Sequence, residues 1–248
     1  MSADMEWSVA TRSHPGRKRT VNEDFFAVDE KLGLFVVADG LGGHVAGRRA
    51  SELGVGVFVE TVATADPEDT AALALLREAF SRANDAIRSL AEREPGLRGM
   101  GTTLAALWLR GDEALLAHAG DSRLYMYRAG ALHALTFDHS LVGERVARGE
   151  LTLEQARVHP SRHVITRAVG VVDVVAPDVA SLRPRPGDVF VICSDGISAQ
   201  LTDAEIRDCL LERRGDLALA ASDLVDLANA RGGEDNATVV LVAIAESD

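Results

Sequence analysis

The sequence is poor in cysteine and in positive charge, which excludes several classes of protein. Its two cysteines, Cys193 and Cys209, form no CxxC pair, and both are predicted to be buried thiols rather than partners in a disulfide. The 26 lysine and arginine residues are outnumbered by 38 aspartate and glutamate residues, which gives a net charge of −12. This balance argues against a nucleic-acid-binding surface and against a polybasic membrane patch.

Long apolar runs and sorting signals are missing as well. No stretch approaches the roughly 18 consecutive apolar residues of a membrane span, and the polar, acidic residues 1–7 are unlike a signal peptide. The sequence has no internal repeat, linker or low-complexity segment. Because 47% of the 248 residues are hydrophobic, the chain can bury a sizeable core. We expect one domain over residues 1–248, monomeric and located in the cytoplasm.

Short apolar segments separated by turn residues predict the strands. Residues 25–29 and 34–38 are expected to form a hairpin around Gly33. Farther along, four strands are predicted to pair in succession as an antiparallel meander. They cover residues 104–109, 114–119, 124–128 and 132–135. Two more apolar segments, 188–193 and 239–244, predict strands near the end of the chain.

Helices are predicted in two groups between the strands. The first group covers residues 45–64 and 69–93, where apolar residues recur every three or four positions. The second covers residues 203–212, preceded by a capping box at Thr202, and residues 216–230. The polar, charged segment 137–163 suits a surface flap better than a core element. This order of elements is typical of an α+β fold with mostly antiparallel strands and helices on the outer faces.

The first hairpin carries an aspartate at the outer end of each strand. Strands of similar length in a hairpin place such ends side by side, so Asp24 and Asp39 are expected to be neighbours. Two carboxylates that close repel each other unless a proton or a cation separates them. Oxygen ligands of this kind suit Mg²⁺ or Mn²⁺.

Five aspartates share this setting at the edge of an apolar strand, beside glycine or asparagine: Asp24, Asp39, Asp121, Asp195 and Asp235. A single aspartate there is an ordinary turn residue. All five together indicate a common pocket whose charge is neutralised by bound cations. A two-metal site is typical of hydrolysis, in which a water that bridges the ions attacks in line. Arg19 can hold an anionic substrate through a bidentate contact, which points to a phosphoester.

Eight motifs follow one another along the chain: Gly16-x-x-Arg19-x-x-Asn22-Glu23-Asp24, Asp39-Gly40-x-Gly42-Gly43-His44, Gly101-Thr102-Thr103, Gly120-Asp121-Ser122-Arg123, Asp138-His139-Ser140, Thr166-Arg167-Ala168-x-Gly170, Ser194-Asp195-Gly196 and Gly233-x-Asp235-Asn236-x-Thr238. In this order they resemble the metal-dependent protein phosphatases of type 2C. The similarity is strongest to the small bacterial members that partner eukaryotic-like Ser/Thr kinases. It extends from Gly16 to Thr238, nearly the whole chain.

The resemblance implies a fold, an activity and a cofactor. The fold would be a central β-sandwich of two antiparallel sheets flanked by helices, in four layers (αββα). The activity would be hydrolysis of phosphoserine and phosphothreonine in proteins, including a eukaryotic-like Ser/Thr kinase. The cofactor would be two Mn²⁺ or Mg²⁺ ions, with a weaker third ion. Residues 137–163 would be the flap that shapes access of substrates.

The resemblance also assigns roles to the metal ligands. Asp39 would bridge the two ions, and Gly40 would offer its carbonyl oxygen. Asp195 and Asp235 would complete the shell of the first ion. Asp24 would act chiefly through water.

Four further residues complete these assignments. Asp121 would help to hold the third ion, and Arg19 would grip the phosphate. His44 would be the general acid for the leaving alkoxide, although a histidine after two glycines can also simply cap the helix that follows. His118 and His139 are expected to be structural.

Two other functions compete with this hypothesis. One is a signalling module that binds a phosphoprotein without turnover; the three intact aspartates Asp39, Asp195 and Asp235 argue against it. The other is a phosphatase of small phosphoesters. A cysteine-based phosphatase is not expected, because Cys193 is not followed by the glycine-rich, arginine-closed anion loop that such chemistry requires.

Overall fold

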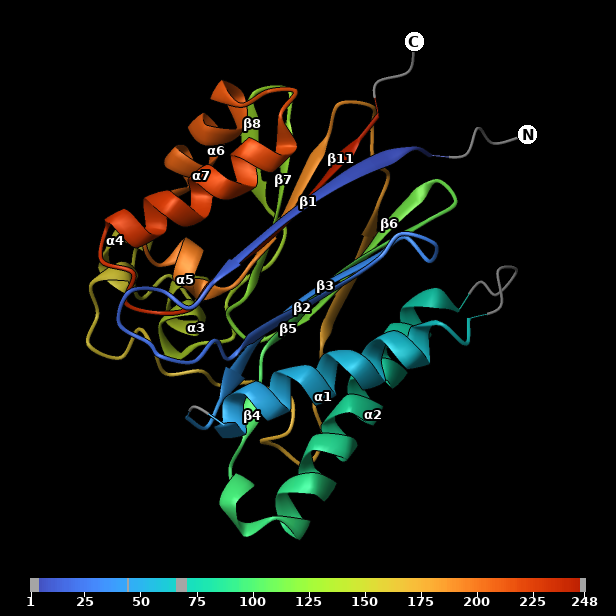
Figure 1. Ribbon diagram of the computed structural model, residues 1–248, viewed down its shortest axis with the longest axis vertical. Helices are drawn as coiled ribbons and strands as arrows, with labels where there is room; N and C mark the ends of the chain where they lie inside the picture. The colour runs from blue at the N-terminus through green and yellow to red at the C-terminus, as the bar shows by residue number, and fades with distance from the viewer. Residues whose placement is uncertain (1–4, 44, 66–70, 246–248) are drawn as a thin grey trace.

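The strands of the computed structural model, which describes residues 5–43, 45–65 and 71–245, form two antiparallel sheets (Figure 1). One, the β11 sheet, has the order β1 (Trp7–His14), β11 (Ala237–Ile244), β10 (Val189–Cys193), β7 (Arg123–Arg128) and β8 (Ala131–Ala134). The other, the β3 sheet, has the order β2 (Asp24–Asp29), β3 (Leu34–Leu41), β5 (Leu104–Arg110), β6 (Glu113–Ala119) and β9 (Asp178–Leu182), and β4 (Gly101–Thr102) pairs with β3.

Helices cover the outer face of each sheet (Figure 1). Helices α1 (Val45–Val62) and α2 (Ala72–Arg93) pack on the β3 sheet, whereas α6 (Asp203–Glu212) and α7 (Leu217–Ala230) pack on the β11 sheet. The short elements are η1 (Pro95–Leu97), α3 (Leu141–Ala147), α4 (Leu153–Arg157) and α5 (Asp195–Ser198). The predicted four-layer αββα sandwich is therefore confirmed.

The apolar runs of the strands are continuous because both faces of each sheet are covered. In β3, Phe35 and Val37 pack between the sheets, whereas Leu34 and Val36 pack against α1 and α2. Side chains alternate along a strand, so only a run without polar interruptions can satisfy both interfaces. The core thus has three layers, one between the sheets and one under each pair of helices.

The predicted four-strand meander is wrong at its centre. Strands β5 and β6 pair, and β7 and β8 pair, but β6 lies in the β3 sheet and β7 in the β11 sheet. The chain crosses between the sheets at residues 120–122. Gly120 has a φ of 118°, and a Cβ atom there would collide with the Thr103 side chain. A glycine at this position therefore lets the chain leave one sheet for the other next to Asp121.

Other predictions are met more closely. The hairpin of β2 and β3, the final helix and the capping box at Thr202 are confirmed. Both cysteines are buried free thiols, as predicted. No helix among the described residues is long and apolar enough to cross a membrane.

Candidate active site

Asp24 and Asp39 lie directly opposite each other in the register of the β2–β3 hairpin, as the sequence predicts. Asp24 is buried. Its Oδ2 atom accepts a hydrogen bond of 2.8 Å from Ser194 Oγ, while its Oδ1 atom is buried without a hydrogen-bond partner. The open end of the hairpin thus presents two adjacent carboxyl groups, one of which has an unsatisfied buried oxygen.

Three more aspartates reach the same place from other elements. Asp121 follows β6, Asp195 is the first residue of α5 after β10, and Asp235 precedes β11. Together with Asp39 they line a cavity of about 810 Å³, which we call the carboxylate pocket. The β3 sheet and the β11 sheet both contribute residues to it, so the pocket lies at the edge where the two sheets meet.

The pKa values of these groups show how unfavourable the crowded negative charge is. Burial, reinforced by repulsion from Asp195 and Asp235, raises the pKa of Asp24 to about 7. Burial and then repulsion from Asp24 raise the pKa of Asp39 well above its usual range. Burial also raises the pKa values of Asp121 and Asp195. These carboxyl groups therefore need a proton or a cation to coexist at neutral pH.

The residues of the pocket fit divalent cations better than protons alone. Asp195, like Asp24, has a buried Oδ1 atom without a hydrogen-bond partner. An uncompensated buried polar atom is costly, and in native proteins it commonly marks an unseen ion or water. Carboxylate and carbonyl oxygens are the ligands that Mg²⁺ and Mn²⁺ prefer. The donor set thus matches the metals expected from the sequence.

Gly40 lines the pocket next to Asp39, and its lack of a side chain is required there. A Cβ atom on Gly40 would overlap the Gly47 carbonyl oxygen and would lie 2.8 Å from the Glu23 carbonyl oxygen. The first turns of α1 therefore pass against the backbone that follows Asp39. This close approach fixes the position of the Gly40 carbonyl group, which the family resemblance assigns to a metal.

Hydroxyl and amide side chains hold the aspartates in place, a role that the sequence alone did not predict. Thr103 Oγ1 accepts from the Asp39 backbone N–H at 2.9 Å. Ser194 Oγ, which donates to Asp24, accepts from the Thr238 N–H at 3.0 Å. Asn236 accepts from the Glu23 N–H at 2.8 Å and donates to two carbonyl groups of residues 15–21. The signal was present in the motifs, as polar residues at the ends of apolar strands.

The basic residues of the pocket come from the N-terminal loop, from the flap and from the end of α7, where Arg231 pairs with Glu205. Arg19 Nη2 lies 2.8 Å from Asp235 Oδ2, and both side chains are partly exposed. Arg157, Arg162 and His163 line the opposite rim. His44, the general acid proposed from the sequence, lies outside the described residues.

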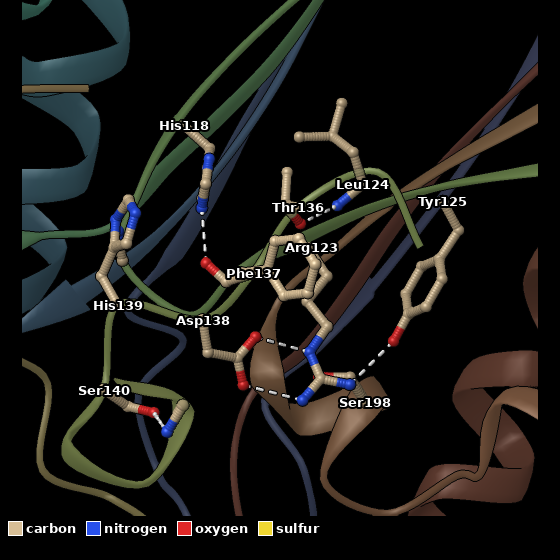
Figure 2. A network of polar contacts seen from close by, with 12 residues as sticks. His118, Arg123, Leu124, Tyr125, Thr136, Phe137, Asp138, His139, Ser140 and Ser198 are labelled. Carbon is tan, nitrogen blue, oxygen red and sulfur yellow. Dashed lines mark hydrogen bonds and ion pairs between the residues drawn. The ribbon is translucent and has the colours of Figure 1, made fainter. Parts of the chain in front are cut away.

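A second polar network surrounds Arg123, two residues after Asp121 in the sequence (Figure 2). Arg123 makes a bidentate ion pair with Asp138, with two contacts of 2.7 Å. The same guanidinium donates to Tyr125 Oη at 2.9 Å. Because this charge pair is fully matched, it fixes the beginning of the flap to β7 without adding net charge to the pocket.

His118, His139 and Asp178 bring their ligand-type atoms to within 4.8 Å of one another. These atoms are already engaged. His118 Nε2 lies 2.9 Å from the Phe137 carbonyl oxygen, and His139 Nδ1 accepts from the Gly120 N–H. His139 Nε2 contacts both Asp178 and Arg167. A cation there would have to displace Arg167, so this cluster is better explained as support for the loop around Asp138, in line with the structural role expected for both histidines.

Comparisons with known proteins agree with this architecture. A family model described as "Protein phosphatase 2C" matches residues 12–226. The chain is 39% identical to protein phosphatase PhpP of Streptococcus pneumoniae, over 98% of this chain and 99% of that protein. It is 37% identical to serine/threonine phosphatase stp of Listeria welshimeri, over 93% of each.

Solved structures give the same result. The Mycobacterium tuberculosis serine/threonine phosphatase PstP superposes with a TM-score of 0.89 at 37% identity, over 97% of this chain and 99% of that one. A PstP catalytic domain in complex with two manganese ions superposes with a TM-score of 0.87 at 36% identity, over 98% of this chain and all of that one.

The αββα sandwich and its carboxylate pocket define a metal-dependent phosphatase. The chain belongs to the protein phosphatase 2C family. The resemblance found in the sequence motifs is thereby confirmed.

Proposed function

We propose that this protein hydrolyses phosphoserine and phosphothreonine side chains of proteins, using Mn²⁺ or Mg²⁺ ions held in the carboxylate pocket. The observation that carries the proposal is the pocket itself, in which carboxyl groups with raised pKa values and unsatisfied oxygens converge from both sheets. PhpP and PstP, which are similar over nearly the whole chain, are named as phosphatases, and PstP has been crystallised with two manganese ions.

The chain offers a ligand set for two ions and a weaker third. Asp39 would serve both ions, Gly40 would offer its carbonyl oxygen, and Asp195 and Asp235 would complete the shell of the first ion. Asp24, opposite Asp39 in the hairpin, would act chiefly through water, and Asp121 would help to hold the third ion. When bound, such ions activate water as a nucleophile and offset the charge of the phosphate.

The other residues of the site bind substrate and handle protons. Arg19 would release Asp235 to a metal and turn its guanidinium to the phosphate, which it can hold with two hydrogen bonds. His44 would protonate the leaving alkoxide of serine or threonine. Both assignments rest on the positions of these residues in the family motifs.

The biological setting follows from the same family membership. The substrates would include a eukaryotic-like Ser/Thr kinase and its targets, and the protein would act in the cytoplasm as a monomer. Residues 1–248 would form one phosphatase domain, with residues 137–163, which contain α3 and α4, as its flap.

Hydrolysis of a phosphothreonine peptide tests this function. We expect phosphate release with Mn²⁺, loss of activity in excess EDTA, and recovery when Mn²⁺ is restored. Binding of the peptide and of Mn²⁺ without phosphate release would instead favour a phosphoprotein-binding module. Rapid hydrolysis of small aryl phosphates with no activity on the peptide would favour a phosphatase of small esters.

A further inference from the structure

A second hollow of about 470 Å³ opens beside the carboxylate pocket. We call it the flap groove, because α3 and α4 of the flap form one wall and the beginning of α6 forms another. Its volume falls within the roughly 300–1,000 Å³ typical of ligand sites. Its apolar lining includes Phe137, Val142, Val146, Leu153, Ala156 and Ala204.

The flap groove is preformed by capped and anchored helices. Ser140 caps α3, and Thr152 caps α4 with a complete capping box. Arg157, at the end of α4, donates to the Ser198 and Leu201 carbonyl oxygens at 3.0 and 2.6 Å. These bonds attach the flap to the segment between α5 and α6, so the two walls are held at a fixed separation.

Two of the charged residues in the groove neutralise each other next to its exposed apolar side chains. Arg123 and Asp138 line the groove but are paired with each other (Figure 2). In contrast, Phe137 and Leu153 are 77% and 65% exposed, although both are large apolar side chains. Exposed apolar side chains gathered around a concave surface are typical of a binding site.

The groove is continuous with the carboxylate pocket. Six residues line both hollows: Asp121, Arg157, Arg162, His163, Asp195 and Ala199. A polypeptide whose phosphorylated side chain enters the carboxylate pocket can therefore extend across the mouth of the groove. Arg162, exposed at this junction, makes no side-chain hydrogen bond or ion pair with the described residues and suits the negative charge of a phosphorylated segment.

We propose that the flap groove binds an apolar side chain of the phosphoprotein substrate, close in sequence to the phosphorylated residue. Leucine, isoleucine, valine and methionine have the size and polarity that the lining requires. This inference rests on the proposed function, and it adds a sequence preference: substrates carry an apolar residue at a fixed offset from the phosphoserine or phosphothreonine. The alternative occupants of the flap groove are a small hydrophobic molecule and a second copy of this chain.

A positional peptide series tests the preference with the chain of residues 1–248 and Mn²⁺. Phosphothreonine peptides with serine at all other positions are compared with peptides that carry one leucine at each offset from −4 to +4. We expect kcat/KM to rise about tenfold at one or two adjacent offsets, because burial of one leucine side chain is worth at least that factor. Equal kcat/KM at every offset would overturn the proposal.

Two variants locate the preference. Ala204→Trp adds a large side chain at an exposed position of α6 and should fill the groove, so that the leucine-to-serine ratio of kcat/KM falls towards one. Leu153→Ser, which removes apolar surface without adding volume, should lower the ratio severalfold and serves if Ala204→Trp does not fold. Val174→Trp is the control, because Val174 is 83% exposed and lines neither hollow, and it should keep the wild-type ratio.

The series separates failure of this inference from failure of the proposed function. Turnover of the all-serine peptide without a leucine preference would leave the phosphatase in place and remove the groove from substrate recognition. An unchanged preference in both Ala204→Trp and Leu153→Ser would place recognition elsewhere on the protein. No turnover of any peptide would contradict the proposed function itself.

Discussion

Gly40 and Gly47 determine how closely α1 approaches the strand that carries Asp39. A Cβ atom on Gly40 would overlap the Gly47 carbonyl oxygen, and a Cβ atom on Gly47 would overlap Oε2 of the Glu23 side chain. At the scale of single residues, the site therefore requires glycine at these two positions as well as the aspartates that line the pocket.

Gly40→Ala tests this close approach. We expect a loss of roughly 1–3 kcal/mol in the free energy of unfolding, because α1 must move away from β3 to accept the methyl group. Gly56→Ala is the matched control: Gly56 lies inside the same helix, its Cβ position is open, and alanine there should stabilise by about 0.5–1 kcal/mol. Urea unfolding in EDTA measures both. Equal midpoints for the two variants would contradict the packing described.

His118 provides a pH-dependent contribution to stability. Burial lowers its pKa to about 4, and a hydrogen bond to the Phe137 carbonyl oxygen only partly opposes the shift (Figure 2). Burial, with Arg167 nearby, lowers the pKa of the stacked His139 as well. In the unfolded chain a histidine titrates near pH 6.5. Between these values the unfolded state binds the proton and the folded state does not.

Stability conferred by neutral His118 is therefore complete above about pH 6.5 and is lost as the pH falls towards 4. The free energy of unfolding of the wild type should decrease over this window by up to about 3 kcal/mol more than that of His118→Gln. Urea unfolding at intervals of half a pH unit measures the difference. His133→Gln, at an exposed position of β8, should leave the wild-type slope unchanged. Parallel curves for wild type and His118→Gln would refute the assignment.

The flap is the element most closely tied to substrate choice. Arg145 of α3 contacts the segments before and after α4, with Nε 3.2 Å from Glu150 Oε2 and Nη1 3.2 Å from His159 Nε2. Neither helix carries one of the five aspartates. Loosening this connection should therefore act on substrates rather than on metals.

Arg145→Ala is expected to change the ranking of phosphopeptides by kcat/KM while leaving the Mn²⁺ concentration for half-maximal activity within about twofold of the wild type. The control is Arg82→Ala, which removes a similar surface ion pair on α2, remote from the pocket. Peptide ranking and Mn²⁺ titration are measured on the same preparations. A shift in the Mn²⁺ titration with an unchanged ranking would show that the flap acts on the metal site instead.

Local sequence patterns predicted most of the helices and strands. The predictions failed where the residues that contact each other are distant in the sequence. The hairpin that pairs Asp24 with Asp39 is set by a short turn, so the sequence predicts it well. Strand β9 was missed because it lies at a sheet edge and only Val179 and Leu182 are partly buried, a spacing that does not give the alternation of a strand. The sequence predicts a hairpin turn at Gly120, where the chain instead crosses between the sheets, because a glycine alone does not show which sheet the next strand joins.

The hydrogen bonds that support the site could not be predicted from local sequence patterns either. Asn236 Oδ1 bonds the Glu23 N–H across 213 positions, and Ser194 bonds Asp24 across 170. Such partners become neighbours only when the two sheets close on each other. The motifs marked these residues as unusual, but only the folded chain shows what they hold.

At the scale of the whole molecule, the two sheets meet at the carboxylate pocket, to which both contribute residues. A bound cation would link Asp39 of the β3 sheet to Asp195 and Asp235, which flank strands of the β11 sheet. Without a cation, the same carboxyl groups repel one another across this boundary. Metal binding and the stability of the sandwich should therefore be coupled.

Thermal unfolding in Mn²⁺ and in EDTA tests this coupling. A concentration of Mn²⁺ one hundred times the dissociation constant should add about 2.7 kcal/mol to the free energy of unfolding and raise the midpoint by several degrees. Asp195→Asn, which removes one of the linking carboxylates, should show a much smaller increase. Identical midpoints of the wild type in Mn²⁺ and in EDTA would show that the pocket does not bind this ion.

The most direct test of the phosphatase site is the activity of Asp39→Asn on a phosphothreonine peptide at saturating Mn²⁺. Asp39 lies opposite Asp24 and lines the pocket, so we predict a loss of kcat/KM of more than about 100-fold with the fold retained. Asp85→Asn, an exposed change on α2, should keep wild-type activity. Wild-type turnover by Asp39→Asn would show that hydrolysis does not depend on Asp39 in the carboxylate pocket.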